Sequence, residues 1–146
     1  MFDGGIAGIG VDLCSVSRME RAMAKEHFAA RVFTQRERDD LASKGKAWAQ
    51  SAAAMFAAKE AAAKALGTGF ASGVMPWLIE VIHQPSGAPG ICLHGAALER
   101  LSAVGGARMH VSLSHEGDTA IAFVVLEART GGAQKDGKDG TQKNGM

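Results

Sequence analysis

Residues 47–66 read AWAQSAAAMFAAKEAAAKAL, and this stretch decides the fold. It is rich in alanine, and Gly67 follows it as a residue that commonly ends a helix. At about 100° per residue, one side of such a helix carries an apolar stripe. The members of that stripe are Trp48, Ala52, Met55, Ala62, Ala63 and Leu66, with Phe56 at its edge. The sequence therefore predicts one long helix with a buried face.

Three charged side chains lie on or beside this stripe. Lys59 falls inside it, while Glu60 and Lys64 lie just beyond its border, one helical turn apart. A Glu–Lys pair at this spacing is commonly a solvated surface pair worth about 0.3–0.5 kcal/mol. Because Lys59 joins the pair, we predict one charged band beside the core that faces a cleft.

A carboxylate closes the apolar run that opens the chain. Residues 9–13 predict a short strand in which Asp12 points away from Val11 and Leu13, and Gly8 and Gly10 allow another backbone to approach closely. Asp12 could simply cap a turn. A dinucleotide-binding fingerprint is not indicated, because its third glycine is absent. Asp12 together with Glu60 would suffice for Mg²⁺, which takes one or two carboxylates plus phosphate oxygens and waters.

The segment 110–118, HVSLSHEGD, places polar groups between two predicted strands. We expect strands over 110–114 and 120–126, joined as a hairpin around residues 116–118. Alternation puts Ser114 on one face and His115 on the other. A nucleophilic serine is not favoured, because no G-x-S-x-G is present. The hydroxyls and imidazoles are expected to donate hydrogen bonds to a ligand or to neighbouring backbone.

Shorter elements are predicted elsewhere in the chain. Two S/T-x-x-E capping boxes, at 17–20 and 34–37, predict the starts of two helices. Strands are expected over 78–82 and 91–93, on either side of a turn-forming run at 85–90, followed by a helix around 96–101.

Composition limits the class of protein. The length of 146 residues fits one domain, which we expect over 1–130, with a disordered tail over 131–146 that consists mainly of Gly, Lys, Asp and Gln. The net charge of +1 gives no reason to expect nucleic acid as a partner. Cys14 and Cys92 lie far apart in apolar contexts, which fits reduced, buried thiols better than a disulfide or a zinc site. No apolar stretch approaches the roughly 20 residues that span a bilayer, and no signal-like segment opens the chain, so we expect a cytoplasmic protein without membrane contact.

Three motifs taken in order resemble the holo-acyl-carrier-protein synthases, over nearly the whole chain up to Leu126. They are Gly8-x-Gly-x-Asp12 followed by Arg18, then Phe56-Ala-Ala-Lys-Glu-Ala-x-x-Lys-Ala-x-Gly-Thr-Gly69, and then His110-Val-Ser-x-Ser-His115. The resemblance implies an α+β fold, with a small antiparallel sheet packed with a long central helix and shorter helices, as in 4′-phosphopantetheinyl transferases. It implies an enzyme of fatty acid biosynthesis that moves the phosphopantetheine arm of coenzyme A to a serine of apo acyl carrier protein and releases adenosine 3′,5′-bisphosphate. Mg²⁺ dependence and a homotrimer are implied as well.

The resemblance also implies roles for individual residues. Asp12 and Glu60 would hold Mg²⁺, and Arg18 and Arg21 would meet the acidic carrier protein. The catalytic set would be Glu60, Lys64, His115 and Glu116, and coenzyme A would contact Lys59, Lys64, Gly67, Gly69, Ser114 and His115. The proton of the acceptor serine could go to a metal-held water polarised by Glu60 or to Glu116, and the sequence does not decide between them.

Two positions depart from the pattern of that family. Met55 stands where an arginine commonly helps to hold coenzyme A, so a phosphate contact is missing or comes from another residue. Glu116 stands where Asp or Thr is common, which leaves a metal role for it in doubt.

Two other classes of function compete with the enzyme. A non-catalytic binding domain has no need for Asp12, Glu60 and Lys64 together. A different nucleotide-phosphate enzyme would more often show a P-loop, which this sequence lacks. Coenzyme A binding without turnover would favour the binding domain.

Overall fold

The computed structural model describes residues 4–130, and the predicted tail over 131–146 lies outside them. The predicted α+β fold is confirmed. The elements follow in the order β1 (Ile6–Ser15), α1 (Val16–Met23), α2 (Phe28–Val32), α3 (Gln35–Ala42), η1 (Gly45–Ala47), α4 (Trp48–Ala65), η2 (Pro76–Leu78), β2 (Ile79–His83), β3 (Pro89–Leu93), α5 (Gly95–Ala103), β4 (Gly106–Glu116) and β5 (Thr119–Ala128). The five-residue α2 and the short 3-10 helices η1 and η2 have no counterpart among the predicted elements.

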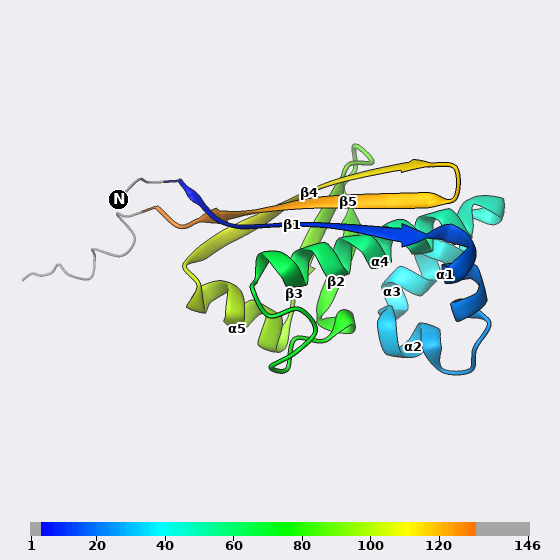
Figure 1. Cartoon of the computed structure of the whole chain (residues 1–146), viewed down its shortest axis with the longest axis horizontal. Coiled ribbons are helices and arrows are strands. Elements are labelled where there is room, and N and C mark those ends of the chain that lie inside the picture. The colour runs from blue at the N-terminus through cyan, green and yellow to red at the C-terminus, as the bar shows by residue number, and fades with distance from the viewer. Residues whose placement is uncertain (1–3, 131–146) are drawn as a thin grey trace, which may run out of the picture.

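The strands form two antiparallel sheets (Figure 1). The larger sheet has the order β1-β5-β4, so the first strand of the chain lies beside its C-terminal hairpin. The predicted hairpin is confirmed, with His115 opposite Ala120 and Glu116 opposite Thr119 next to the turn. The smaller sheet pairs β2 with β3.

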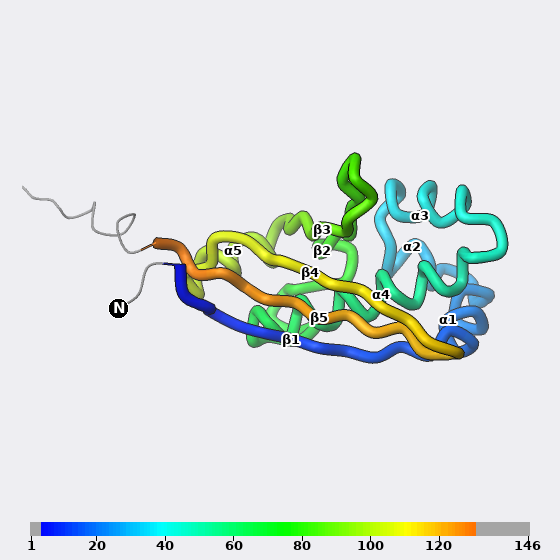
Figure 2. The backbone as a smooth tube through the Cα atoms, turned by 90° about the horizontal axis from the view of Figure 1, so that it is seen from above, coloured from blue at the N-terminus to red at the C-terminus, as the bar shows by residue number. Residues whose placement is uncertain are grey.

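The long helix α4 packs against one face of the larger sheet. Figures 1 and 2 show the three long strands as one layer, with α4 running along it and α1, α2 and α3 gathered at one end. The helix contacts β1 and β5, and both α4 and β5 have buried side chains, namely Ala52, Ala53, Ala57, Ala58, Ala61 and Ala62 of α4 and Ala120, Ala122, Val124 and Leu126 of β5. The predicted long helix is therefore confirmed, and alanine lets it lie close to the sheet.

Two glycines bring β1 still closer to α4. A Cβ at Gly8 would collide with the carbonyl oxygen of Ala65, and a Cβ at Gly10 would collide with that of Ala61. The predicted close backbone approach is thus confirmed. Because side chains alternate along a strand, the residue two positions after Gly10 faces the same helix, and that residue is Asp12.

The two predicted capping boxes have different outcomes. At the start of α3, the backbone N–H of Glu37 donates to Thr34 Oγ1 at 3.1 Å and that of Thr34 donates to Glu37 Oε1 at 2.8 Å, which confirms the box. The box at Ser17 is wrong, because α1 begins at Val16 and its N-cap is Ser15.

The face of the larger sheet that points away from α4 is apolar and exposed. Ile9, Val11 and Leu13 of β1 and Phe123 of β5 keep 45–64% of their surface accessible in the single chain. Val11 and Phe123 are direct neighbours across the sheet. This face therefore presents an apolar surface along β1 and β5, while its β4 edge carries the exposed polar residues His110, Ser112 and Ser114.

The cysteines are both free, as predicted, but only Cys14 is partly buried. Cys92 is exposed on β3, so the prediction of two buried thiols is wrong for this residue. Within residues 4–130, no helix is both long and apolar enough to cross a membrane.

Candidate functional site

Asp12, Glu60 and Lys64 meet where β1 crosses α4. The ammonium of Lys64 donates to Asp12 Oδ1 at 2.9 Å and to the carbonyl oxygen of Val11 at 3.0 Å. Asp12 is mostly buried, whereas 53% of the Lys64 side chain is exposed. The two carboxylates predicted to hold a metal therefore lie together at an accessible edge of the core.

The electrostatics of this corner are dominated by negative charge. Burial, and then the charge of Asp12, raise the pKa of Glu60, while Lys64 opposes the shift. Burial also raises the pKa of the nearby Cys14 thiol to about 11, with Glu60 and Asp12 adding to the effect. Two neighbouring carboxylates at an accessible edge are a favourable place for a hard cation, so the donor set fits Mg²⁺.

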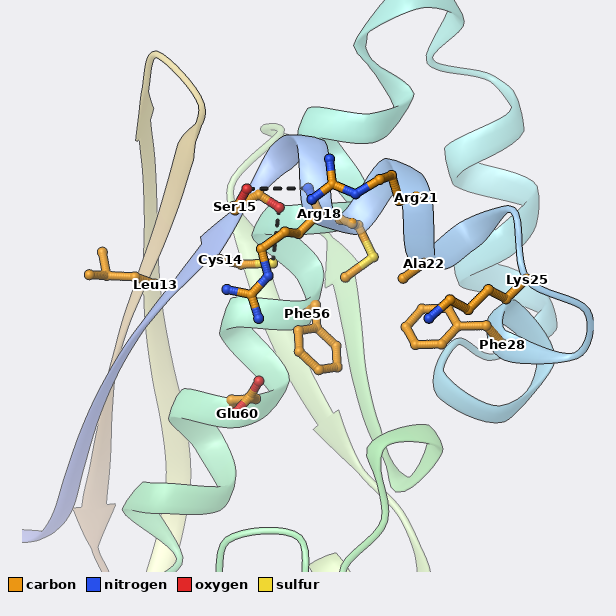
Figure 3. A pocket seen from close by; sticks show the side chains of 11 residues that line it. Leu13, Cys14, Ser15, Arg18, Arg21, Ala22, Lys25, Phe28, Phe56 and Glu60 are labelled. Atoms are coloured by element: carbon orange, nitrogen blue, oxygen red, sulfur yellow. Dashed lines mark hydrogen bonds between the residues drawn. The ribbon is translucent and has the colours of Figure 1, made fainter.

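An open pocket of about 420 Å³ begins at Glu60 and extends towards α1 and α2 (Figure 3). Its floor includes Cys14, Phe56 and Phe28, and its rim carries Arg18, Arg21 and Lys25. Figure 3 shows the side chain of Arg18 reaching from α1 along the pocket towards the side on which Glu60 lies. The residues predicted to meet a carrier protein thus border the same pocket as one predicted metal ligand.

The hairpin turn holds the start of α1 beside this pocket. Asp118 accepts hydrogen bonds from the hydroxyl groups of Ser15 (2.8 Å) and Ser17 (2.7 Å) and from the backbone N–H of Ser17 (2.9 Å). Its carbonyl oxygen accepts from the N–H of Val16 at 2.8 Å. These bonds explain the wrong capping box, because the Ser17 hydroxyl is engaged by a residue 101 positions away. Asp118 was not predicted, and no local pattern could have identified it.

Ser114, His115 and Glu116 lie elsewhere, at the end of the hairpin. They line a second open pocket together with Leu13 and the residues of the turn, and Glu60 does not line it. His115 Nδ1 lies 2.8 Å from the amide nitrogen of Gln50 on α4, so His115 faces the helix as the alternation predicts. Within one chain, the structure does not bring these residues into the pocket that contains Glu60.

Lys59 is not part of a charged band, and this prediction is corrected. Its side chain has no exposed surface, and its ammonium lies 2.8 Å from Glu37 Oε1. The ammonium also donates to the carbonyl oxygens of Pro76 (2.9 Å) and Ile79 (2.6 Å). All its donors are used inside the core, so we withdraw Lys59 from the residues proposed to contact coenzyme A.

The remaining predicted positions flank the end of α4. Gly67 and Gly69 have positive φ angles of 84° and 60°, and Gly69 N–H donates to the carbonyl oxygen of Ala63, which closes the helix. They follow Lys64 directly, and a ligand role for them stays a prediction. Met55 is 2% exposed and packs in the core, so it supplies no phosphate contact in place of the arginine.

Comparison with known proteins gives one consistent family. A model described as the 4′-phosphopantetheinyl transferase superfamily matches residues 8–124. A holo-[acyl-carrier-protein] synthase from Solidesulfovibrio magneticus is 46% identical over 84% of this chain and 98% of its own length. One from a Methylobacterium species is 49% identical over 84% of this chain and 95% of its own.

Solved structures agree with the sequence comparison. The crystal structure of holo-[acyl-carrier-protein] synthase from Neisseria meningitidis is 39% identical, covers 83% of this chain and 98% of its own, and superposes with a TM-score of 0.74. The Helicobacter pylori synthase, solved in complex with coenzyme A, is 31% identical, covers 81% of this chain and 98% of its own, and has a TM-score of 0.71.

Proposed function

We propose that this chain, which belongs to the 4′-phosphopantetheinyl transferase superfamily, is a holo-[acyl-carrier-protein] synthase. It transfers the 4′-phosphopantetheine group of coenzyme A to a serine of apo acyl carrier protein and releases adenosine 3′,5′-bisphosphate. The single observation that carries the proposal is the meeting of Asp12, Glu60 and Lys64 beside an open pocket, in a chain whose relatives share this name over almost their full length. We expect it to act in the cytoplasm, in fatty acid biosynthesis.

The transfer depends more on positive charge placed beside the diphosphate of coenzyme A than on a covalent bond between substrate and protein. Asp12 and Glu60 are the residues that would hold Mg²⁺, which when bound neutralises phosphate oxygens. Lys64 is exposed and bonded to Asp12, so its ammonium can turn to a phosphate without crossing the core. Lys64 and the cation that Asp12 and Glu60 would hold could then both contact the negative charge of the diphosphate.

The acceptor serine must lose its proton during the attack. Glu60 is the carboxylate that lines the pocket, where it could polarise a water held at the metal site. Glu116 lines the other pocket of the same chain. We therefore propose that the proton leaves towards Glu60.

The carrier protein approaches along α1 in this proposal. Acyl carrier proteins are acidic, and Arg18, Arg21 and Lys25 give the rim of the pocket positive charge. Such complementarity speeds association and fixes orientation. Asp118 supports this arrangement, because it holds the first turn of α1 beside the end of β1.

We further propose that the working form is a homotrimer. The exposed apolar face of the larger sheet, with Ile9, Val11, Leu13 and Phe123, is a surface that assembly would cover. The resemblance to holo-acyl-carrier-protein synthases implies an active site between subunits, which would let His115 of one chain serve the pocket of another. Light scattering should give three chains, whereas a monodisperse and fully active monomer would refute this assembly.

Mass spectrometry tests the proposed reaction directly. After incubation with this protein, coenzyme A and Mg²⁺, an apo acyl carrier protein should gain the mass of one phosphopantetheine group. A carrier protein whose acceptor serine is replaced by alanine is the control, and chelation of Mg²⁺ should stop the transfer. Coenzyme A binding without any gain of mass would instead favour a binding domain.

A further inference from the structure

A second group of metal-binding side chains lies on the smaller sheet, outside the pocket described above. Glu80 of β2, Cys92 of β3 and His94 just after β3 bring one ligand atom each to within 4.8 Å of the others. None of the three belongs to the motifs at residues 8–18, 56–69 and 110–115. Their chemistry is therefore not explained by the transfer reaction.

The backbone fixes this arrangement. Glu80 and Cys92 are directly opposite each other in the β2–β3 pair, so their side chains share one face of the sheet. His94 follows Cys92 by two residues with extended backbone angles of φ −131° and ψ 156°, which keeps its side chain on that face. The N–H of His94 donates to the carbonyl oxygen of Leu78 at 2.9 Å, which extends the pairing beyond β3.

The carboxylate of Glu80 is oriented before any ion arrives. The hydroxyl of Thr34 donates to Oε2 at 2.7 Å, while Oε1 lies 3.1 Å from His94 Nε2. Burial alone would raise the pKa of Glu80, but the hydrogen bonds from Thr34 and His94 lower it overall, so the group is a carboxylate at neutral pH. Glu80 is 8% exposed and Cys92 is exposed, so the cluster of three residues is held by the protein on the Glu80 side and open to solvent on the Cys92 side.

We propose that Glu80, Cys92 and His94 form a binding site for a divalent ion of borderline softness, with Zn²⁺ as the preferred occupant. Zn²⁺ accepts sulfur, imidazole nitrogen and carboxylate oxygen at about 2.0–2.3 Å, and commonly takes three protein ligands and one water. Ligand atoms around such an ion lie roughly 3.3–3.8 Å apart, so Glu80 Oε1 and His94 Nε2, now 3.1 Å apart, would separate by only a few tenths of an ångström. All the ligand atoms lie within 4.8 Å of one another, so the exposed thiol of Cys92 has to move inward by at most roughly 1 Å.

Binding exchanges protons for the ion. The Cys92 thiol loses its proton to solvent, and His94 binds through Nε2 as a neutral imidazole with its hydrogen on Nδ1. Affinity for the ion should therefore rise with pH. Mg²⁺ should not compete, because it prefers oxygen ligands and six-fold coordination.

Co²⁺ is the probe that tests the site, since a thiolate bound to Co²⁺ gives a charge-transfer absorption band. The metal-free, reduced full-length chain should bind one Co²⁺ with this band, and Zn²⁺ should abolish it. The chain has two cysteines, so Cys92→Ser should remove the band while the matched variant Cys14→Ser keeps it. A band that survives Cys92→Ser, or the absence of any band, overturns the proposal.

Calorimetric titration with Zn²⁺ tests the other two ligands. His94→Gln and Glu80→Gln should each weaken the affinity at least about tenfold. If Glu80→Gln does not fold, His94→Gln and Cys92→Ser decide the result, because both side chains are exposed. Unchanged affinity in His94→Gln would overturn the three-ligand site. Carrier-protein modification by Cys92→Ser at ordinary Mg²⁺ should equal that of the wild type, so this site and the proposed function fail separately.

Discussion

Two lysines on α4 lie five positions apart and have opposite surroundings. Lys59 is fully buried, with Glu37 and two carbonyl oxygens around its ammonium. The side chain of Lys64 is half exposed. Its ammonium pairs with Asp12, and the carboxylate of Glu60 lies close to both. The ammonium of Lys59 has every donor satisfied by the fold, while that of Lys64 is exposed beside the two carboxylates Asp12 and Glu60.

The two lysines illustrate two roles of charged residues: some stabilise the fold, and others are available for the reaction. A buried pair without one partner is strongly destabilising, because the remaining charge cannot return to water. An exposed pair contributes little to stability and is free to exchange partners. Changes around Lys59 should therefore affect the free energy of unfolding, and changes around Lys64 should affect turnover.

The largest expected effect is a loss of activity when Asp12 or Glu60, the two carboxylates beside Lys64, is replaced. Asp12→Asn and Glu60→Gln should each lower transfer by at least about 100-fold at ordinary Mg²⁺, since each removes a charge that would hold the cation. The midpoint of thermal unfolding should not fall. Glu99→Gln, an exposed change on α5, is the control for the loss of one carboxylate. Near-normal turnover by either variant would remove the metal assignment.

The next effect is on stability, at the buried pair. Lys59→Met should lower the free energy of unfolding by about 3–5 kcal/mol in urea titrations, because the carboxylate of Glu37 stays buried without its cation. The double variant Glu37→Gln, Lys59→Met should recover a large part of this loss. The recovery should be incomplete, because the amide oxygen of glutamine can still accept from Thr34 N–H, but its NH2 group cannot accept from Val81 N–H as Glu37 Oε2 does.

Lys59→Met also tests the correction made to the site. At a temperature where the variant is folded, its KM for coenzyme A should equal that of the wild type. A raised KM without any loss of stability would return Lys59 to the ligand-binding residues and break the contrast between the two lysines.

Local signals predicted the parts of the fold that local bonds determine. The alanine-rich stripe predicted α4, and the Thr34 capping box predicted α3, because both partners of each bond lie within four residues. The alternation around Asp12 predicted its face correctly, since the period of a strand is fixed by its backbone. The same reasoning, with the resemblance, brought Asp12, Glu60 and Lys64 to one site.

The errors arose where a distant residue decided the outcome. Ser17 was wrongly assigned as a cap because Asp118, on the hairpin turn, takes its hydroxyl. Lys59 was wrongly placed in a cleft because Glu37 and the carbonyl oxygens of residues 76 and 79 surround it. Cys92 was predicted to be buried from its apolar neighbours, yet it is exposed opposite Glu80 of β2, because the packing around β3 leaves it uncovered. These contacts depend on packing between elements, which periodicity does not encode.

A smaller effect is expected at the positive rim of the pocket. Arg18→Glu should raise the KM for acyl carrier protein by about tenfold at low ionic strength, with little change in the KM for coenzyme A. Wild-type association should weaken with added salt. The matched control is Arg129→Glu, which reverses a charge just beyond β5, at the opposite end of the molecule from α1 (Figure 1). An unchanged KM for the carrier protein would mean that it docks elsewhere.

The smallest effect sharpens the contrast through pH. Because burial and the charge of Asp12 raise the pKa of Glu60, the folded protein binds this proton more tightly than the unfolded chain does. In the pH window just above the ordinary pKa of glutamate, the folded state therefore holds more protons, and the free energy of unfolding contributed by Glu60 falls as pH rises. Glu60→Gln has no proton to lose, so in metal-free buffer it should be at least as stable as the wild type above this window, and the difference should vanish at low pH. Added Mg²⁺ should stabilise the wild type and leave the variant unchanged. Denaturant titrations across this pH range measure the difference. If Glu60→Gln became less stable than the wild type as pH rose, the account would be contradicted, because the charge of Glu60 would then stabilise the fold as the buried Glu37–Lys59 pair does.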